Sequence, residues 1–176
     1  MSLMIRPVDL KQDRAQLIAY ARDLFAISFA NPTQFNDQFG GDGTAYISWI
    51  AEKQASGPAS ACLIFFNGEH AGMVVVGPWP EDEEVGYVYH YYLERRFRGL
   101  GLAANMDAHA VRTLLRAGYT TARLSVAETN TRARRFYGRQ GWSHVGPRPD
   151  QPGILYMSRT LARHSVRKSE VPRRPW

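Results

Sequence analysis

The segment from Tyr87 to Ala104 constrains the fold of this chain more than any other stretch. Residues Tyr87–Leu93 are mostly aromatic and include neither glycine nor proline, which is typical of a buried strand. From Leu102 onward, apolar residues recur every four positions, which is typical of one face of a helix. The residues between these two parts are therefore predicted to form a glycine-rich turn that leads from a strand into a helix.

The composition of this turn indicates a phosphate-binding site. The first backbone N–H groups of a helix have no intrahelical partners, and the helix dipole is positive at that end. Gly99 and Gly101 also let the backbone come close to a ligand. We therefore expect the turn to bind a phosphate or pyrophosphate group. The residues assigned to this site are Arg98, Gly99, Leu100, Gly101, Leu102, Ala103 and Ala104.

A glycine-rich turn can also serve purposes other than this one. In that case the glycines would only allow tight packing of the helix on the strand. Both interpretations stay open at this point, because a short glycine motif alone is weak evidence for a phosphate site. A P-loop is excluded, because the chain has no G-x-x-x-x-G-K-[ST] sequence. The looser dinucleotide-binding fingerprint fits Gly99-x-Gly101-x-x-Ala104, with Glu128 beyond it. Too little of the chain follows, however, for a second nucleotide-binding half.

A second motif follows the apolar segment Ala122–Ala127. It reads N-x-x-A-x-x-F-Y-x-x-x-G-W and starts at Asn130. Asn130, Ala133 and Tyr137 are three and four residues apart, so they share one helix face. Each residue could also have a purely structural role: Asn130 would cap the helix, Tyr137 would join the core and Gly141 would end the helix.

The two motifs together resemble those of the GNAT superfamily of acetyl-CoA-dependent N-acyltransferases. The resemblance rests on R-G-x-G-x-A after one strand and N-x-x-A-x-x-F-Y-x-x-x-G-W after the next, in this order and at this separation. It extends from Met4 to Leu161 and is strongest over Tyr87–Trp142. The pairing is far more specific than either motif alone.

The order of the predicted elements indicates an α/β (α+β) fold. Strands alternate with helices and hairpins occur early and late, so we expect one GNAT-like domain, residues 1–161, with a mixed central sheet of about six or seven strands and helices on both faces. The basic C-terminal tail, residues 162–176, is predicted to be exposed, because it has no apolar period. The predicted elements are Met4–Arg6, Asp9–Phe29, Thr44–Gln54, Ser60–Phe66, Ala71–Val76, Tyr87–Leu93, Leu102–Ala117, Thr121–Ala127, Thr131–Gln140, Trp142–Val145 and Ile154–Arg159.

The resemblance implies a reaction and a set of site residues. Acetyl-CoA would be the co-substrate, and a primary amine would attack the thioester directly in a ternary complex. The scattered histidines form no metal-binding signature, so no metal is expected. Main-chain groups of Tyr91 and Leu93 would hold the pantetheine arm, and Asn130 joins the residues predicted to bind the cofactor. Tyr137 matches the tyrosine that acts as general acid on the departing CoA sulfur.

The general base is left open by the sequence. An amine with a pKa of ~10.4 is mostly protonated at neutral pH, so the site has to help remove a proton. A strict alternation predicts that Tyr87, Tyr89 and Tyr91 share one strand face. Because a phenol is a poor base at neutral pH, we expect a water relay through Tyr87 or Tyr89 towards Glu84 or Glu128. The predicted catalytic residues are Tyr137, Glu84 and Tyr89.

The segment Asn31–Gly43 and the following helix would form one wall of the acceptor site, by resemblance to the family. Phe35, Phe39, Tyr46 and Trp49 would supply aromatic surface there, although core packing accounts for Tyr46 and Trp49 equally well. The acidic run Glu81–Glu84 is interpreted as a solvated turn, or alternatively as an anionic rim that attracts a cationic amine.

Composition limits the remaining function classes. The formal charge of +6 comes almost wholly from arginine and suits a polyanionic ligand, but much of it lies in the tail, so nucleic-acid binding is not expected. The single cysteine, Cys62, lies in an apolar run and is predicted to be a core thiol. No membrane span or secretory signal is apparent, so the expected location is the cytoplasm.

Besides a nucleic-acid-binding role for the arginines and the tail, which is not expected, two functional hypotheses follow from the sequence. The first is an N-acetyltransferase that acts on a small-molecule or peptide amine. The alternative is a non-catalytic acyl-CoA-binding module, which the lack of a carboxylate on the central strand favours. The acceptor, the oligomeric state, with a homodimer as one expectation, and the role of the tail are not determined by the sequence.

Overall fold

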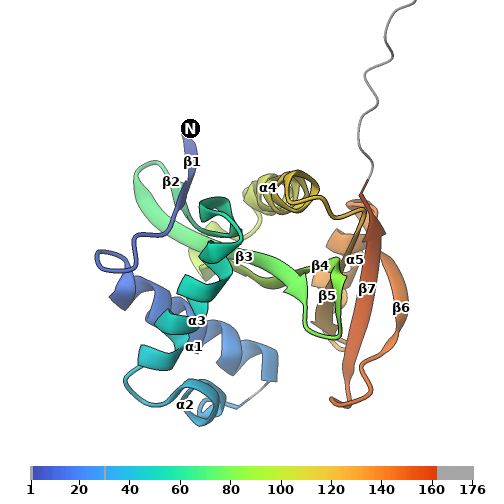
Figure 1. Cartoon of the computed structure of the whole chain (residues 1–176), viewed down its shortest axis with the longest axis horizontal. Helices are drawn as coiled ribbons and strands as arrows, with labels where there is room; N and C mark the ends of the chain where they lie inside the picture. Colours follow the sequence, from blue (N-terminus) through green and yellow to red (C-terminus); the bar gives the residue numbers. More distant parts are fainter. Residues whose placement is uncertain (1, 30, 162–176) are drawn as a thin grey trace, which may run out of the picture.

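The structure is a computed structural model that describes residues 2–29 and 31–161 (Figure 1). Within these residues no helix is both long and apolar enough to cross a membrane. The predicted C-terminal tail, residues 162–176, lies outside the described residues. The described elements, in chain order, are β1 (Leu3–Pro7), α1 (Arg14–Phe29), α2 (Gln34–Phe39), α3 (Thr44–Ala55), η1 (Pro58–Ser60), β2 (Ala61–Phe66), β3 (Glu69–Trp79), β4 (Asp82–Leu93), η2 (Arg95–Phe97), α4 (Leu102–Arg116), β5 (Thr121–Ala127), α5 (Thr131–Arg139), β6 (Ser143–Pro147) and β7 (Ile154–Thr160).

The seven strands form one mixed sheet in the order β1-β2-β3-β4-β5-β7-β6. Neighbouring strands are antiparallel except β4 and β5, which are parallel. The parallel pairing is short: it runs only from Gly86↔Ala122 to Val88↔Leu124. Beyond Val88 the two strands separate. The mixed sheet of a single α/β domain confirms the predicted fold class (Figure 1).

Helices cover both faces of the sheet and create two hydrophobic cores. Helices α1, α2 and α3 pack on one face, where Leu17 and Ile50 meet Met73 and Val75 of β3. Helix α4 packs on the opposite face, where the neighbouring β3 residues Val74 and Val76 are buried. Strand β3 is therefore apolar at successive positions, as expected for a strand covered on both sides. The predicted core thiol Cys62 is 1% exposed and belongs to the α4 core.

A β-bulge interrupts the central strand β4. The register with β3 passes from Val75↔His90 directly to Val76↔Val88, so Tyr89 is an extra residue without a partner. An extra residue reverses the alternation of side chains beyond it.

The predicted common face of three β4 tyrosines is therefore wrong. Tyr87 and Tyr89 pack together on the side of α3, with ring centroids 4.9 Å apart. Tyr91 lies on the opposite side and joins the core under α4. The alternation rule failed because it assumes an uninterrupted ladder.

Several element boundaries also differ from the prediction. Helix α1 begins at Arg14 and not at Asp9, because the Asp9 carboxylate accepts hydrogen bonds from the N–H groups of Lys11 and Gln12 and forms a turn. The predicted loop Asn31–Gly43 contains the short helix α2, which buries Phe35. The acidic run is only partly a turn, since β4 already begins at Asp82 and pairs there with Trp79.

The contact of β3 with the end of β4 can be tested at Gly72. A Cβ atom at this buried position would overlap the carbonyl oxygen of Tyr92 in the neighbouring strand. We predict that Gly72→Ala lowers the free energy of unfolding by about 1–3 kcal/mol, as overpacking does. Gly146→Ala is the matched control, because no heavy atom lies within 4 Å of its added Cβ. Chemical denaturation measures both, and equal stability of the two variants would contradict this close packing.

Candidate active site

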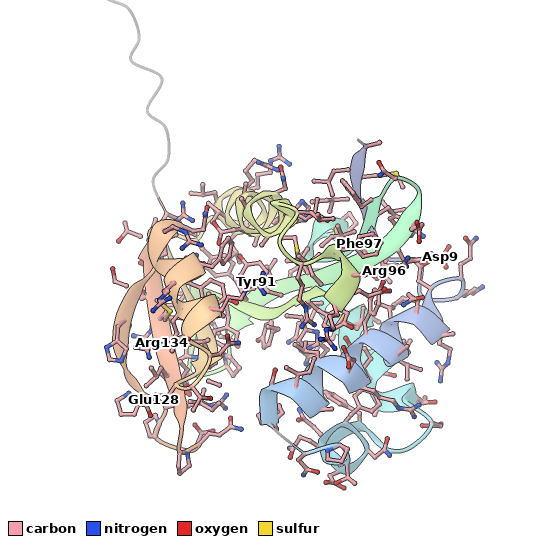
Figure 2. The ribbon with its side chains drawn as sticks, turned by 180° about the vertical axis from the view of Figure 1, so that it is seen from behind. Asp9, Tyr91, Arg96, Phe97, Glu128 and Arg134 are labelled. Atoms are coloured by element: carbon pink, nitrogen blue, oxygen red, sulfur yellow. The ribbon has the colours of Figure 1, made fainter. Side chains whose placement is uncertain are left out.

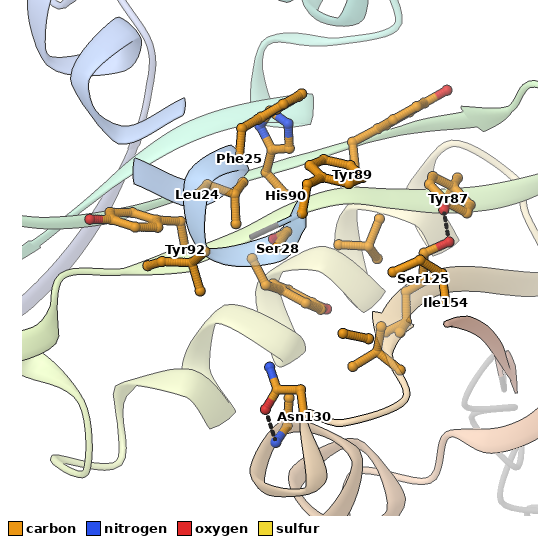
Figure 3. A pocket seen from close by; sticks show the side chains of 18 of the residues that line it. Leu24, Phe25, Ser28, Tyr87, Tyr89, His90, Tyr92, Ser125, Asn130 and Ile154 are labelled. Carbon is orange, nitrogen blue, oxygen red and sulfur yellow. Dashed lines mark hydrogen bonds between the residues drawn. The ribbon is translucent and has the colours of Figure 1, made fainter. Parts of the chain in front are cut away.

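A cleft of about 990 Å³ opens where β4 and β5 separate (Figure 3). Its walls include Tyr87–Leu93 of β4 and Leu124–Ala127 of β5. Residues of α1, α2 and α3 line one part of the cleft, and residues of α4 and α5 line another. The short parallel pairing thus produces an opening in the middle of the sheet.

The predicted glycine turn lies beside this cleft. Gly99 and Gly101 have φ angles of 88° and 81°, in the left-handed region that favours glycine. Gly101 is the N-cap of α4, and no side chain caps the helix there. The Arg98 Nε group donates to the carbonyl of Leu93 at 2.8 Å and ties the turn to the end of β4. The uncapped start of α4 therefore lies next to the cleft, which Arg98 and Ala103 line.

The other residues predicted to bind the cofactor are divided between the cleft and its surroundings. Tyr91, Leu93 and Asn130 line the cleft. Because the β5 pairing described above ends at Val88, the main chain of Tyr91 and Leu93 has no neighbouring β5 residue. Leu102 is buried in the core under α4, whereas the side chain of Leu100 is exposed.

Helix α5 brings an arginine to the glycine turn that the sequence did not single out. The Arg132 Nη2 atom lies 3.7 Å from the position that a Cβ of Gly99 would occupy, and Arg132 lines the cleft. Arg134 instead donates to the carbonyl of Glu128 at 3.1 Å, and Figure 2 shows these two residues together near the start of α5. Several arginines share this helix, so sequence spacing could not show which one faces the turn. The N–H group of Ala104 is already used by the carbonyl of Gly101 at 3.3 Å.

Tyr137 lies on the α5 wall of the cleft and stacks on Tyr91, with ring centroids 5.8 Å apart and planes 29° apart. Asn130 positions this helix, because its side chain accepts a hydrogen bond from the N–H group of Ala133 at 3.1 Å. Burial raises the pKa of Tyr137 above its ordinary value, and the nearby Asp107 carboxylate raises it further. The phenol is therefore protonated at neutral pH and available as a hydrogen-bond donor.

Asp107 of α4 connects the two halves of the separated sheet. Its carboxylate accepts hydrogen bonds from the hydroxyl of Tyr91 at 3.1 Å and the indole N–H of Trp142 at 2.8 Å, and it pairs with the guanidinium of Arg159 at 2.7 Å. Tyr91 belongs to β4, whereas Trp142 precedes β6 and Arg159 belongs to β7. Asp107 is 2% exposed, so all three donors compensate a buried charge.

We predict that removing this carboxylate destabilises the protein strongly. Asp107→Ala leaves three buried or half-buried donors without their acceptor and should lower the free energy of unfolding by about 3–5 kcal/mol. Glu69→Ala is the control: it removes an exposed ion pair with Arg96 and should leave the free energy nearly unchanged. Urea denaturation measures both variants, and similar losses would show that Asp107 does not bridge the halves.

The part of the cleft under α1–α3 is aromatic. The ring of Trp49 contacts the rings of Tyr89 and His90, at centroid distances of 5.2 and 5.3 Å. Burial lowers the pKa of His90 to about 3, so its imidazole is neutral at physiological pH. Burial raises the pKa of Tyr89 to about 12, and its hydroxyl donates to the carbonyl of Pro78. Neither residue is suited to accept a proton at neutral pH.

Among the described residues, Glu81 is the one carboxylate that lines the cleft. It lies in the turn between β3 and β4, and the hydroxyl of Tyr156 donates to its Oε1 atom at 2.6 Å. Glu84, which the sequence favoured, is not brought to the cleft; it lines a shallow depression with Tyr119 beyond the end of α4. Glu128 does not line the cleft either. The sequence showed the acidic run but not which of its members faces the cleft.

The other sequence-predicted aromatic residues are divided between core and cleft. Phe35 and Tyr46 are 1% and 0% exposed and serve the core. Phe39 and Trp49 line the cleft. Within residues 2–29 and 31–161, no three His, Cys, Asp or Glu side chains are grouped so that they could hold a metal ion.

The family follows from comparison with known proteins. A family model described as the acetyltransferase (GNAT) family matches residues 19–142. The chain therefore belongs to the GNAT acetyltransferase family. An uncharacterized N-acetyltransferase from Archaeoglobus fulgidus is 31% identical over 99 residues, a match that covers 54% of this chain and 65% of that relative.

Solved structures share the fold at low sequence identity. The structure of yncA from Salmonella typhimurium, solved with its cofactor acetyl-CoA, has a TM-score of 0.75 and 18% identity, covering 96% of this chain and 99% of that one. The PaiA N-acetyltransferase from Thermoplasma acidophilum, solved with coenzyme A, has a TM-score of 0.73 and 15% identity, covering 91% and 99%. These similarities confirm the architecture described above.

Proposed function

We propose that this protein transfers the acetyl group of acetyl-CoA to a primary amine by direct attack in a ternary complex. The observation that carries the proposal is the opening between β4 and β5, which has the uncapped start of α4 beside it and Tyr137 on its wall. One part of the cleft suits a phosphate-bearing nucleotide and another is open to an acceptor. The acetyl-CoA and coenzyme A in the two structures named above support this assignment of the cleft.

The residues around the glycine turn fit coenzyme A. The left-handed Gly99 and Gly101 allow a pyrophosphate to approach the N–H groups at the start of α4, and Arg132 adds a guanidinium at the same place. The free main-chain edge of Tyr91 and Leu93 is suited to hydrogen-bond the amides of an extended pantetheine arm. When bound, acetyl-CoA supplies the acetyl group as a reactive thioester.

Two measurements separate an enzyme from a non-catalytic module. Calorimetry with coenzyme A tests the cofactor site, and thiol release from acetyl-CoA in the presence of a panel of amines tests transfer. Binding together with transfer supports the proposal. Binding without transfer to any amine would favour an acyl-CoA-binding module, the alternative suggested by the absence of a carboxylate on the cleft-lining part of β4. Absence of binding would contradict both functions.

We propose that Tyr137 donates a hydrogen bond or a proton to the departing CoA sulfur. Its phenol is protonated at neutral pH, because burial and the Asp107 carboxylate raise its pKa. A thiol has a pKa of ~8.5, so full proton transfer from a phenol to the thiolate is uphill by about 2 kcal/mol even for an unperturbed tyrosine. Tyr137 therefore acts by donating a hydrogen bond to the thiolate as much as by protonating it.

We predict that Tyr137→Phe lowers kcat by about 10–100-fold, at or below the lower end of what a general acid contributes. The affinity for coenzyme A should change little, because the ring and its stacking on Tyr91 remain. Steady-state kinetics and calorimetry measure the two quantities separately. Unchanged turnover would show that the hydroxyl has no part in the reaction.

The general base is proposed to act from the rim of the cleft. Of the carboxylates considered, Glu81 faces the cleft and Glu84 does not. The Tyr87 hydroxyl is 2.6 Å from the hydroxyl of Ser125 in β5. Burial is the main cause that raises the pKa of Tyr87, and the charge of Glu81 also raises it. We propose that water carries the proton from the amine along Tyr87 to Glu81, with Tyr89 forming the adjoining wall.

Two amide substitutions distinguish the carboxylates. Glu81→Gln should lower kcat/KM for the amine by about 100-fold, the lower end of the range for a general base, and it should leave coenzyme A affinity unchanged. Glu84→Gln should have a much smaller effect on kcat/KM. The pH dependence of kcat/KM is measured for both variants. A larger loss for Glu84→Gln would restore the carboxylate that the sequence favoured.

A further inference from the structure

The acceptor part of the cleft is built from a continuous series of aromatic rings. Phe29 and Phe39 each contact Phe25, at centroid distances of 5.4 and 5.8 Å. The series continues from Phe39 to Trp49 at 6.0 Å and from Trp49 to Tyr89 at 5.2 Å. All five residues line the cleft, and they come from α1, α2, α3 and β4. Figure 3 shows Phe25 and Tyr89 on this side of the pocket.

A second aromatic wall comes from β3, β4 and β7. The rings of Trp79 and Tyr156 meet edge to face at a centroid distance of 5.6 Å, and both residues line the cleft with Tyr87. The two groups of rings adjoin, because Tyr87 contacts Tyr89 at a centroid distance of 4.9 Å, so an acceptor bound against them meets ring faces and ring edges. Such surfaces favour a flat aromatic group or a branched apolar group over a strongly hydrated one.

Few charges accompany these rings. Beyond Arg98 and Arg132 near the glycine turn, Glu81 and Arg148 are the charged residues among the described cleft lining. Arg148 is held in a two-pronged ion pair with Asp150, at 2.7 and 2.8 Å. His90 is neutral, because burial lowers its pKa to about 3. The acceptor part thus offers one carboxylate, Glu81, and a guanidinium that is already paired. The ammonium of Lys53 also lies against this part, 4.8 Å from the centroid of Tyr89, and it pairs with Glu52 at 3.3 Å.

This set of charges disfavours acceptors with several ammonium groups. A polyamine or an aminoglycoside would bring several such groups to a site with a single carboxylate, and ammonium groups that lose water without a partner bind poorly. One ammonium group is compatible with the site, because Glu81 attracts a cation. The rings of Trp49 and Tyr89 already have the ammonium of Lys53 over them, at 5.3 and 4.8 Å from their centroids, so they serve the apolar body of the acceptor.

We infer that the acceptor is a primary monoamine with an aromatic or branched apolar body and no other charge. This inference rests on the proposed acetyl transfer and adds the class of amine. The aromatic walls determine specificity for the body of the molecule, and Glu81 attracts its single ammonium group.

The first test compares matched amines by thiol release from acetyl-CoA. We expect kcat/KM for 2-phenylethylamine to exceed that for ethylamine by about 10–100-fold, the range expected from burying one aromatic side group. It should also exceed the values for spermidine, kanamycin and a short peptide with a free amino terminus. Equal values for 2-phenylethylamine and ethylamine, or a higher value for any of the other three, would overturn the inference.

The second test uses variants of the aromatic wall. Trp49→Ala should lower kcat/KM for 2-phenylethylamine and leave that for ethylamine nearly unchanged. If Trp49→Ala unfolds, Phe29→Ala repeats the test, because Phe29 is the last residue of α1 and is only partly buried. Val145→Ala is the matched control, because Val145 is 48% exposed and does not line the cleft. A loss that is equal for both amines would show that the wall does not select the body.

Calorimetry keeps this inference separate from the proposed reaction. With coenzyme A bound, the protein should bind 2-phenylethylamine more tightly than spermidine. If that preference is found but no amine is acetylated, the acceptor class stands and the proposed transfer fails. If an amine is acetylated but spermidine binds more tightly, the transfer stands and the acceptor class fails.

Discussion

The short parallel pairing between β4 and β5 is the constraint on which the rest of this structure depends. The ladder ends at Val88↔Leu124, so a continuous sheet is opened at its centre while its outer strands remain paired. Unpaired main-chain groups are costly in an apolar interior, but here they line a cleft, where a ligand or water can satisfy them. The opening is thus both an interruption of the sheet's pairing and the place where the cofactor and the acceptor are expected to meet.

Buried polar contacts keep this opening at a fixed width. Asp107 holds Tyr91 on one side and Trp142 and Arg159 on the other, through hydrogen bonds between 2.7 and 3.1 Å long. Breaking one such contact would leave a buried charge poorly compensated, so the arrangement resists gradual deformation. The same carboxylate acts on Tyr137 through its field and through the stacked Tyr91. Support of the sheet and preparation of the site therefore depend on one side chain.

The sequence predicted the parts of this protein that local rules determine. The strand, glycine turn and helix around Gly99 and Gly101 were found because their periodicities and backbone requirements are local. The bulge at Tyr89 was missed, because an unpaired residue is defined only by the neighbouring strand. Glu81 and Arg132 were likewise not singled out, because each lies among similar charges and only the folded chain shows which of them faces the cleft.

The bulge at Tyr89 has a consequence for how such an enzyme can diversify. The direction of side chains is set separately on the two sides of the bulge, so that Tyr89 belongs to the aromatic wall while Tyr91 faces α4 and α5. Substitutions before the bulge can reshape the surface around Tyr89 without turning the residues that face α4 and α5. One strand therefore carries two independently adjustable surfaces, and a change of substrate during evolution need not disturb the chemistry shared with other members of the family.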